Sequence, residues 1–578
     1  MHTLGINAAF HDCSAALVRD GVPVAAAEEE RFTRIKHGKR PVPFSTWQLP
    51  YNAIDYCLRE AGLDLRDVDH IAYSFDPKIL LPELAPEGVF RLPMEPSAAP
   101  KAPNGGSPWD PLFLSYIINA PRQLADGVPH HLQRRYAGAG LDSILERWQF
   151  VEHHLTHEAS AFLASPYEDA AVLAMDGRGE RASTSYGHYR NGKYDRIRQI
   201  NLPHSLGLLY EDVTRYLGFL HSSDEYKVMA LASYGRAHYM DEFRDILRTD
   251  GHGGYTLHAA DLEARFGPPR VRGEAFEDRH ADIAHSLQCV LEETVLDMAR
   301  WLRSATQSDN LCMAGGVALN CVMNAKLADA GIFKNVWVQP AAGDAGTSLG
   351  AALWVDFHHR EADRRGWVMD HAYLGPAYSD EEIEAFLQRS HIAYERLDDI
   401  AAAAADLLAE EKIIGWFQGR MEFGPRALGA RSILASPRDA LMQARLNELK
   451  DREDFRPVAP VVLAERAHEW FDAHGKPGIE APFMLFVFDV LTDKAAAIPA
   501  VRHIDGTARV QTVSSRQHPL LHELLTAFEA RTGVPVLVNT SFNTRGEPVV
   551  CSPRDALESF WTSPLDALVI GSFLVEKP

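Results

Sequence analysis

The chain has 578 residues, of which 46% are hydrophobic and 24% are charged, and its formal net charge is -21. Because one hydrophobic core does not grow to this size, we expect two to four domains. The negative charge argues against a nucleic-acid partner, whose phosphates would be repelled. No apolar stretch approaches the roughly 20 residues of a membrane-spanning helix, so we expect no membrane partner either.

The first thirty residues predict three strands joined by turns. The apolar segment TLGINA is followed by the polar turn FHDCS, by SAALVR, by the pair Asp20-Gly21 and by VPVAAAEEE. An Asp-Gly pair between two apolar runs is a strong indication of a β-hairpin. A strand here, in place of a basic leader, predicts no signal peptide. Together with six cysteines that form no CxxC pair, this pattern predicts a cytoplasmic location.

Residues 151–160, VEHHLTHEAS, place three histidines within five positions. His153 and His157 are four residues apart, so on a helix they share one face and their rings could converge on one metal ion. The alternative is a solvated helix end that is rich in histidine, because the 26 histidines of the chain give many accidental spacings. The pair alone leaves both interpretations open.

The hairpin pattern returns at residues 169–198. There DAAVLAMDGRGE predicts a strand ending in a turn, and STSYGHYR and KYDRIRQI predict two strands around Asn191-Gly192. Two copies of one pattern indicate an internal duplication. Such a duplicated unit is typical of the actin-like (ASKHA) ATPases, in which two RNase H-like halves hold a nucleotide between their turns. Chance similarity of two hairpins is the alternative.

Two glycine turns follow, each between a predicted strand and a predicted helix. NLCMAGGVALNCVMNAKLAD has its turn at Gly315-Gly316, and NVWVQPAAGDAGTSLGAALWV has its turn at residues 343–346. Glycine lets a backbone approach a ligand closely, and a helix N-terminus offers unpaired N–H groups to phosphate. One such turn is usually only structural, but its repetition in a duplicated frame favours nucleotide binding.

The sequence pattern changes near residue 370. Before that point, residues 95–110 are rich in Pro, Gly and Ser and predict a surface excursion. Just after it, Ser379 and Glu382 form a candidate helix capping box. Beyond the box, KIIGWFQ and VPVLVNTSF predict strands and DIAAAAADLLAEE predicts a helix. We therefore predict one domain over residues 1–370 and an α/β domain over residues 371–578.

Residues 419–461 form a basic segment in an acidic chain. Its cations are Arg420, Arg426, Arg431, Arg438, Arg445, Lys450, Arg452 and Arg456. Guanidinium groups match the geometry of phosphate and carboxylate. We predict an anion site that uses Arg426, Lys450 and Arg456, and we assign Arg438 and Arg445 to ion pairs on a helix surface.

The strand segment VLVNTSFNTRGEPVV ends in the polar residues Asn539, Thr540, Ser541 and Asn543. Small hydroxyl and amide side chains at the carboxyl end of a strand can hold a ligand, although they can also form an ordinary polar turn. Neither the G-x-S-x-G elbow of a hydrolase nor a Walker loop G-x-x-x-x-G-K-[ST] occurs in this stretch. The segment is therefore a candidate cradle of another kind.

Eleven blocks together resemble one enzyme family. In chain order they are FHDCSAAL, EEERFTRIKHGK, EHHLTHEASAF, DGRGE, YKVMALA, AGGVALN, GDAGTSLGAA, GRMEFGPRALGARSIL, KDREDFRPVAP, ARVQTV and NTSFNTRGEPVV. This set is similar to the antibiotic and Nod-factor O-carbamoyltransferases over nearly the whole chain. The resemblance implies an α/β fold, with an N-terminal actin-like (ASKHA) domain of two RNase H-like halves and a C-terminal YrdC-like α/β domain.

The resemblance also implies two active sites and a reaction in two steps. The C-terminal domain would make carbamoyl-adenylate from carbamoyl phosphate and ATP, which binds with Mg²⁺. The intermediate would pass through an internal chamber to the N-terminal domain. There a metal-assisted step would transfer the carbamoyl group to a hydroxyl of a small secondary-metabolite acceptor, in a monomer or a homodimer.

Matching the blocks residue by residue implies the metal ligands and the base. His153, His157 and Asp344 would hold a divalent metal, with iron(II) favoured and zinc or manganese as alternatives. His154 would point away and act behind the ligands or at the surface. His11 is the candidate base for the acceptor hydroxyl, or a structural residue that caps its turn.

The same matching implies the residues that bind carbamoyl phosphate and nucleotide. Those assigned to the anion and adenylate site are Arg426, Lys450, Arg456, Arg509, Asn539, Ser541 and Asn543. Those assigned to further cofactor contacts are Asp12, Lys36, Asp176, Gly177, Gly179, Lys227, Gly315, Gly316, Asn320 and Gly343.

Two other functions fit part of the pattern. An actin-like sugar kinase would use the N-terminal fold alone, and it would leave the basic segment at 419–461 unexplained. A non-catalytic nucleotide-sensing regulatory protein would show no turnover and would tolerate the loss of His153.

Overall fold

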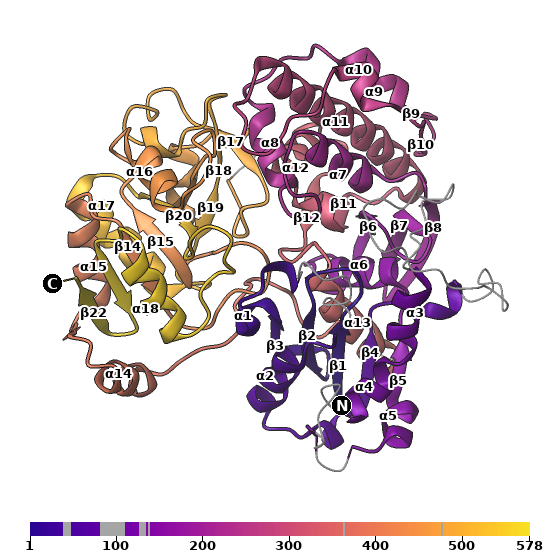
Figure 1. Cartoon of the computed structure of the whole chain (residues 1–578), viewed down its shortest axis with the longest axis horizontal. Helices are drawn as coiled ribbons and strands as arrows, with labels where there is room; N and C mark the ends of the chain where they lie inside the picture. The colour runs from indigo at the N-terminus through magenta and orange to yellow at the C-terminus, as the bar shows by residue number, and fades with distance from the viewer. Residues whose placement is uncertain are drawn as a thin grey trace.

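The computed structural model describes residues 1–38, 48–80, 110–126, 135–136, 139–361, 365–475 and 478–577. Three large sheets organise the fold: two are built from residues 2–338 and one from residues 395–576 (Figure 1). Figure 1 shows the C-terminal sheet on the left and the two N-terminal sheets on the right. The predicted surface excursion over residues 95–110 lies outside the described residues, apart from its last position.

The first sheet has five strands in the order β3-β2-β1-β4-β5. These strands are β1 (His2–Asn7), β2 (Ser14–Arg19), β3 (Val22–Glu28), β4 (His70–Tyr73) and β5 (Trp148–Phe150). β1 pairs antiparallel with β2 and parallel with β4, and the β2–β3 hairpin turns at Asp20-Gly21 as predicted. Leu4 and Ile6 of β1 are buried in a cluster with residues of α2 (Tyr51–Ala61), which covers this face.

The second sheet repeats the topology of the first, in the order β8-β7-β6-β11-β12. These strands are β6 (Asp169–Met175), β7 (Ala182–Arg190), β8 (Lys193–Asn201), β11 (Asn310–Ala314) and β12 (Asn335–Val338). In each sheet the first strand along the chain pairs antiparallel with the second and parallel with the fourth. The predicted internal duplication is therefore confirmed, and the repeated sheets agree with an actin-like domain of two halves.

Two helices lie between these sheets and contact each other. α6 (His153–Phe162) follows β5 of the first sheet but packs on β6, β7 and β11 of the second. α13 (Ala345–His359) follows β12 of the second sheet but packs on β1, β2 and β4 of the first. The approach is close, because a Cβ atom on Gly350 would lie 1.8 Å from the backbone oxygen of Thr156. This exchange brings the first turns of both helices to the junction of the two halves.

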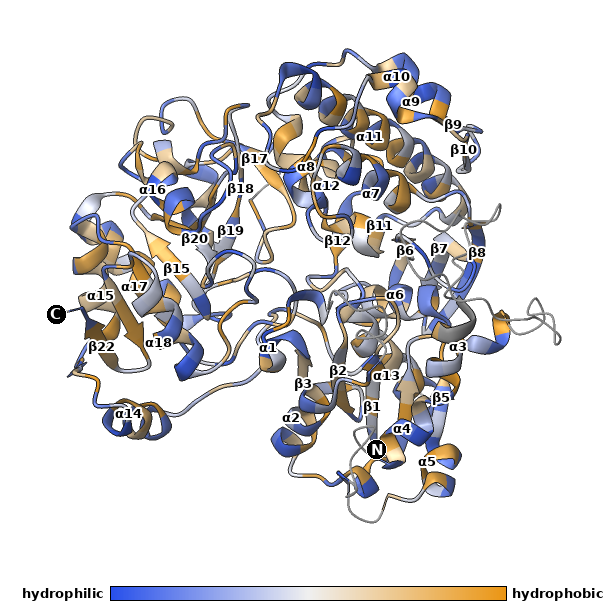
Figure 2. Cartoon of the chain, in the orientation of Figure 1, coloured by the Kyte–Doolittle hydropathy of each residue, from blue (hydrophilic) through white to orange (hydrophobic). Residues whose placement is uncertain are grey.

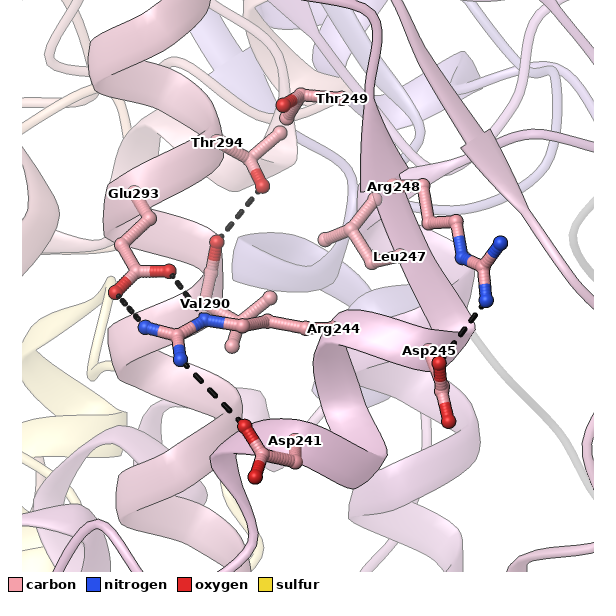
Figure 3. Close-up of a pocket in the computed structure, with 9 residues that line it drawn as sticks. All are labelled: Asp241, Arg244, Asp245, Leu247, Arg248, Thr249, Val290, Glu293 and Thr294. Atoms are coloured by element: carbon pink, nitrogen blue, oxygen red, sulfur yellow. Dashed lines mark hydrogen bonds and ion pairs between the residues drawn. The ribbon is translucent and has the colours of Figure 1, made fainter.

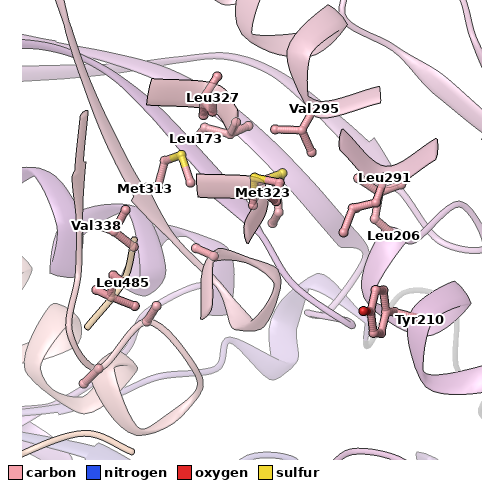
Figure 4. Packing of buried hydrophobic residues seen from close by; sticks show 14 of the residues in the cluster. Leu173, Leu206, Tyr210, Leu291, Val295, Met313, Met323, Leu327, Val338 and Leu485 are labelled. Carbon is pink, nitrogen blue, oxygen red and sulfur yellow. The ribbon is translucent and has the colours of Figure 1, made fainter. Parts of the chain in front are cut away.

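The largest hydrophobic cluster packs helices against the second sheet. Along α11 (Asp278–Thr306) buried residues recur at helical spacing, as in Leu287, Leu291 and Val295. Figure 4 shows part of this cluster, with Leu173 of β6 and Met313 of β11 among residues of the helices. The other helices of this half are α7 (Leu206–Tyr216), α8 (Glu225–Ala232), α9 (Met240–Ile246), α10 (Leu262–Phe266) and α12 (Cys321–Asp329).

Residues 395–576 form a mixed sheet of eight strands in the order β13-β22-β21-β14-β15-β20-β16-β19. The strands are β13 (Glu395–Arg396), β14 (Ile414–Phe417), β15 (Arg431–Ala435), β16 (Ala459–Leu463), β19 (Gln511–Val513), β20 (Val536–Ser541), β21 (Ala567–Ile570) and β22 (Phe573–Glu576). Its helices are α15 (Ile400–Ala409), α16 (Met442–Leu449), α17 (Pro519–Thr532) and α18 (Pro553–Thr562). The predicted strands and the predicted helix of this region are confirmed.

The region around residue 370 connects these parts. The predicted capping box of Ser379 and Glu382 is present at the start of α14 (Asp380–Arg389). Among the described residues, no sheet combines strands from both sides of residue 370. The exact boundary and the YrdC-like nature of the C-terminal domain stay predictions.

Hydropathy follows this layering. Figure 2 shows hydrophobic residues concentrated in strands such as β15, whereas the peripheral helix α14 alternates hydrophilic and hydrophobic positions. Searched over the residues given above, the helices include none with the length and apolar character needed to cross a membrane.

Candidate metal centre and anion site

Four buried side chains meet where the two N-terminal halves join. His153 is the first residue of α6 and His157 lies one turn further on the same face. Asp344 precedes the first turn of α13, and Asp176 directly follows β6. The exchange of α6 and α13 between the sheets explains why residues so far apart in sequence converge here.

The atoms of this cluster are close enough to share one ion. The Nε2 atoms of His153 and His157 are 3.2 Å apart, and each lies 3.6 Å from Oδ1 of Asp344. Asp176 lies 3.8 Å from His153 and 3.9 Å from His157. One ligand atom from each of the four residues lies within 4.8 Å of all the others. The group therefore has the size and composition of a metal site.

The hydrogen bonds around the cluster fit a cation at its centre. Both carboxylate oxygens of Asp344 are buried and accept no hydrogen bond from the described residues. Nδ1 of His153 lies 3.1 Å from the carbonyl oxygen of Ser74. If Nδ1 donates to that carbonyl, the Nε2 lone pair points at the centre, which is how ligating histidines are held in metal sites. Two imidazoles and two carboxylates suit iron, zinc or manganese.

The electrostatics of the cluster point the same way. Burial opposes the charged form of His153, but Asp344 and Asp176 outweigh it and hold its pKa well above the usual value. Burial would raise the pKa of Asp176, but His153 and His157 outweigh it and hold the pKa well below the usual range. The cluster thus favours ionised carboxylates facing a positive charge, which a proton or a metal cation can provide.

His154 occupies a different place from its neighbours. Its side chain is fully buried, so the surface alternative is wrong. Nδ1 lies 3.1 Å from Oγ of Ser185, and burial holds the pKa of His154 well below the usual value. His154 therefore packs behind the cluster as a neutral ring.

His11 and Asp12 lie in the turn after β1, beside the cluster of His153, His157, Asp176 and Asp344, which is called the metal cluster below because it could hold a metal ion. Nδ1 of His11 is 2.9 Å from Oδ2 of Asp12 and 3.8 Å from Oδ2 of Asp344. The other oxygen of Asp12 lies 2.9 Å from Nδ1 of His37. The turn thus brings the candidate base next to the metal cluster. Each carboxylate oxygen of Asp12 contacts one histidine, His11 or His37.

The glycine turns lie around the same cluster. The N–H of Gly316 donates to Asp176 over 2.8 Å. Gly315 has a φ of 91°, a backbone conformation that favours glycine. Gly177 and Gly179 form the turn after Asp176, and a Cβ on Gly179 would lie 2.8 Å from the ring of His154. Gly343 directly precedes Asp344. These turns lie against the cluster of His153, His157, Asp176 and Asp344.

One predicted contact of this region has another partner. The side chain of Asn320 caps α12 by accepting from the N–H of Met323, and its amide donates to Gln288 over 2.8 Å. The hydrogen bonds of Asn320 are therefore used inside the protein, and its expected cofactor contact gains no support.

A second cluster lies in the C-terminal domain, at the end of β20. Nζ of Lys450 lies 3.2 Å from Oγ of Ser541 and 2.8 Å from Oδ1 of Asn543. Burial lowers the pKa of Lys450 well below the usual value, and the positive charges of Arg452, Arg456 and Lys36 lower it further. The structure therefore brings Lys450, Ser541 and Asn543 together in a strongly positive environment.

The arginines of this cluster lack protein partners for part of their N–H groups. Nε of Arg426, Nε of Arg509 and one Nη of Arg452 are buried without a hydrogen-bond partner among the described residues. Burial, followed by the charge of Arg509, lowers the pKa of Arg426 to about 9. Burial, followed by the charge of Arg456, lowers that of Arg452 to about 9. Buried and unpaired cations are costly, and a bound anion would relieve this cost.

The other basic and amide residues of the segment are held by protein groups. Arg438 pairs with Glu411 at 2.6 Å, whereas Arg445 donates to the backbone oxygen of Glu411 at 3.3 Å instead of forming a side-chain ion pair. The amide of Asn539 donates to Gln511 over 2.7 Å. Among the described residues the ion pair is therefore confirmed for Arg438 only, and Arg438 lies before α16 instead of on a helix surface.

The N-terminal domain contributes to the wall of this second cluster. Lys227 of α8 pairs with Glu453 at 3.0 Å and with Asp224 at 3.3 Å. The guanidinium of Arg456 lies 4.8 Å from the ring centre of Tyr226 and 3.6 Å from Glu453. Lys227, expected to contact a cofactor, thus joins the two domains beside Arg456.

Two residues have roles that the sequence did not assign. Asp176 was expected at the nucleotide, but it lies in the metal cluster, and its place directly after a buried strand is the feature that could have indicated this. Arg452 lies among the cations of the second cluster, although only its position in the basic segment pointed to it.

One hollow on the described surface belongs to neither cluster. It has a volume of about 630 Å³ and lies between α9, β9 (Leu247–Thr249) and α11 (Figure 3). Arg244 pairs there with Glu293 at 2.7 Å, and Arg248 pairs with Asp245 at 3.0 Å. Its charged groups thus satisfy one another.

Two family models match the chain. The model described as Carbamoyltransferase N-terminus matches residues 2–93 and 132–353, and the model described as Carbamoyltransferase C-terminus matches residues 405–577. The first match includes all four residues of the metal cluster, and the second includes Lys450 and Ser541.

Individual proteins match over similar lengths. The chain is 40% identical over 628 residues to uncharacterized protein sll1178 of Synechocystis sp., covering 100% of this chain and 97% of that protein. It is 39% identical over 587 residues to nodulation protein NolNO of Sinorhizobium fredii, covering 99% of this chain and 80% of that protein. Among solved structures, HypF of T. kodakarensis is similar with a TM-score of 0.32 and 13% identity, over 62% of this chain and 48% of that chain.

Proposed function

The chain belongs to the carbamoyltransferase family of enzymes, and from this premise we propose that it is an ATP-dependent O-carbamoyltransferase with two separate sites. One observation supports this proposal above all. A buried cluster of histidines and carboxylates lies in one domain, and a buried cluster of cations with unpaired N–H groups lies in the other. The first suits metal-assisted transfer, and the second suits phosphates.

We propose that the cation cluster, which consists of Arg426, Lys450, Arg452, Arg456 and Arg509, binds carbamoyl phosphate and ATP and makes carbamoyl-adenylate. Water releases inorganic phosphate from carbamoyl phosphate, and the carbamate oxygen then attacks the α-phosphorus of ATP. Pyrophosphate leaves, so that one adenylate, one pyrophosphate and one phosphate are formed. Arg426, Arg452 and Arg509 would stabilise the phosphate charges, and Lys450 would hold the reacting oxygens near Ser541.

In the second step, the acceptor hydroxyl attacks the carbamoyl carbon and AMP leaves. A metal held by His153, His157, Asp344 and Asp176 would act as a Lewis acid beside the carbamoyl carbonyl. His11 would take the proton of the acceptor hydroxyl, and Asp12 would orient the ring of His11 through Nδ1. Iron(II) is the metal that we propose first, with zinc and manganese as alternatives, and the adenylate would move between the domains inside the protein.

For the acceptor we propose a secondary-metabolite hydroxyl. The blocks of the chain resemble the tobramycin carbamoyltransferase, and the formal net charge of -21 would attract a polycation. An aminoglycoside is therefore the first acceptor to test, and a neutral polyketide alcohol is the second.

The decisive experiment uses the purified full chain with ATP, Mg²⁺ and carbamoyl phosphate. We expect pyrophosphate release that depends on carbamoyl phosphate, and mass spectrometry should then detect a carbamoylated product when an acceptor is added. Transfer of phosphate to the acceptor, without any need for carbamoyl phosphate, would instead identify a kinase.

A further inference from the structure

A buried ion pair of the N-terminal domain reaches into the C-terminal domain. Glu28 ends β3 and Arg31 lies in α1 (Glu30–Thr33), which Figure 1 places at the junction between the domains. Their side chains are only 5% and 3% exposed, and Nη2 of Arg31 lies 3.0 Å from Oε1 of Glu28. A pair buried this deeply is costly unless its remaining hydrogen bonds are satisfied.

Nη1 of Arg31 also pairs with Glu30 of its own helix at 2.9 Å, and the hydrogen bonds that leave the N-terminal domain go to one residue, Gly424. Oε1 of Glu28 accepts from the N–H of Gly424 at 2.8 Å, and Nη2 of Arg31 donates to the carbonyl oxygen of Gly424 at 2.9 Å. Gly424 has a φ of 119°, and a Cβ atom on it would lie 3.1 Å from the backbone oxygen of Pro340. The pair thus hydrogen-bonds both the N–H and the C=O of one residue, at a backbone conformation that favours glycine.

Gly424 lies two positions before Arg426 of the cation cluster. The other side of the same loop is held within the C-terminal domain, because Oε1 of Glu422 accepts from the N–H groups of Leu428 at 2.7 Å and Ala430 at 2.8 Å. Arg426 therefore stands on a short loop that is fixed on both sides. Its Nε has no partner among the described residues, so the position of this guanidinium depends on its backbone.

We propose that the Glu28–Arg31 pair of the N-terminal domain positions Arg426 of the C-terminal domain for anion binding. The proposal rests on the anion site of the proposed function and adds residues of the other domain to it. Neither Glu28 nor Arg31 would touch the anion. Both act through Gly424, so that the cation cluster is complete only when the two domains are docked.

The test is a double-mutant cycle on anion binding, with inorganic pyrophosphate as the probe and the full chain in the calorimeter. We expect Arg31→Met to weaken pyrophosphate binding roughly tenfold, as for coupled residues that share one loop. In the background of Arg426→Ala, the same change should weaken binding less than twofold, because the group that it positions is gone. Arg31→Lys keeps a donor near Glu28 and Gly424, so it should restore part of the affinity.

A matched control separates positioning from general loss of stability. Asp356→Asn weakens another ion pair, between the buried Asp356 and the partly exposed Arg360 at 2.6 Å, which lies away from the cation cluster. We expect this variant to lower the thermal unfolding temperature and to bind pyrophosphate as the wild-type chain does. If Arg31→Met does not fold, Glu28→Gln replaces it, since Glu30, which lies 2.9 Å from Arg31 in the wild-type chain, would still neutralise the arginine.

The outcomes distinguish the two claims. Equal losses from Arg31→Met with and without Arg426, or no loss at all while Arg426→Ala weakens binding, would overturn the positioning role and leave the anion site standing. Failure of the wild-type chain to bind pyrophosphate, or indifference of binding to Arg426→Ala, would overturn the anion site and the positioning role together.

Discussion

At the scale of one residue, Asp344 shows why the four-residue cluster favours a cation. Both of its oxygens are buried without a hydrogen-bond donor among the described residues, and two imidazole nitrogens lie 3.6 Å from one of them. An ionised carboxylate in such surroundings is expensive unless a cation compensates it. A ligand that binds only the folded state adds its binding free energy to stability.

The first prediction concerns this metal. Chelation should stop carbamoyl transfer and lower the thermal unfolding temperature, and one divalent ion per chain should restore both. Asp176→Asn should lower metal affinity by roughly 10- to 100-fold, as loss of a metal contact does, while its amide oxygen still accepts from Gly316. Elemental analysis and thermal unfolding measure these effects. Active protein that contains almost no metal and ignores chelators would contradict the prediction.

The second prediction separates the two half-reactions. Lys450→Ala should abolish the release of pyrophosphate that depends on carbamoyl phosphate, because Lys450 would hold the reacting oxygens in the cation cluster. His157→Ala should leave that release nearly unchanged and stop transfer, because His157 belongs to the other domain. A coupled pyrophosphate assay and product mass spectrometry measure the two steps. Loss of pyrophosphate release in the histidine variant would mean that the sites are not separate.

At this scale the sequence predicted some residues much better than others. The four-residue spacing of His153 and His157 identifies a shared helix face, and the structure places their Nε2 atoms together. The place of Asp176 depends on the pairing of β6 with β11 and on the turn at Gly316, which no local pattern specifies. The interdomain contacts of Glu28 and Arg31 likewise depend on how the domains dock.

At the scale of elements, the crossing of α6 and α13 determines the geometry of the metal cluster. His153 is the first residue of α6, and Asp344 is the N-cap of α13. Gly350 has no side chain, so the backbone of α13 can contact that of α6 at Thr156. Hairpins, glycine turns and helix starts were predictable because Asp-Gly, Asn-Gly and capping residues act locally. The order of the strands and the exchange of the helices follow from long-range packing, so the sequence indicated a duplication without giving its arrangement.

The third prediction tests this crossing. Gly350→Ala places a Cβ against the backbone of Thr156, so the helices must separate. We expect a loss of stability of about 1–3 kcal/mol, typical of overpacking, together with weaker metal binding. Gly140→Ala is the matched control, because no atom of the described residues lies within 4 Å of the added Cβ. Equal metal affinity and stability in both variants would show that the close approach is unimportant.

At the scale of the whole molecule, His474 links the two domains. Its Nδ1 lies 2.8 Å from Asp329 of α12, and its Nε2 lies 3.3 Å from Asp489 of β17 (Val487–Asp489). Partial burial opposes the charged ring, but Asp329, Asp472 and Asp489 outweigh it and raise the pKa of His474 above its usual value. The charged ring therefore stabilises the docked domains.

The fourth prediction is a pH dependence of this contact. Because the folded-state pKa is raised, the stabilisation is fully present below the usual pKa of about 6.5 and is lost as the pH rises through the raised value. His474→Gln should therefore lower the unfolding temperature by about 1 °C in mildly acidic buffer, as for a partly exposed pair, and by less in alkaline buffer. A difference that grows with pH would contradict this sign.

The fifth prediction concerns the charge of the whole chain. An excess of 79 acids over 58 bases must lie largely at the surface, because unpaired carboxylates are rarely buried. If the acceptor is an aminoglycoside, kcat/KM should fall as ionic strength rises, since steering of a polycation is screened by salt. A neutral polyketide alcohol serves as the comparison. Preference for the neutral alcohol, without any salt effect, would reject the cationic acceptor.

The exchange of α6 and α13 also bears on how such a chain could arise. Each half of the N-terminal domain gives its last helix to the sheet of the other, and the cluster takes two histidines from one half and two aspartates from the other. A solitary ancestral half would have lacked a partner sheet for its helix and half of the ligands. Because identical copies would supply identical residues, the division into two histidines from one half and two aspartates from the other requires that the copies diverged after the duplication.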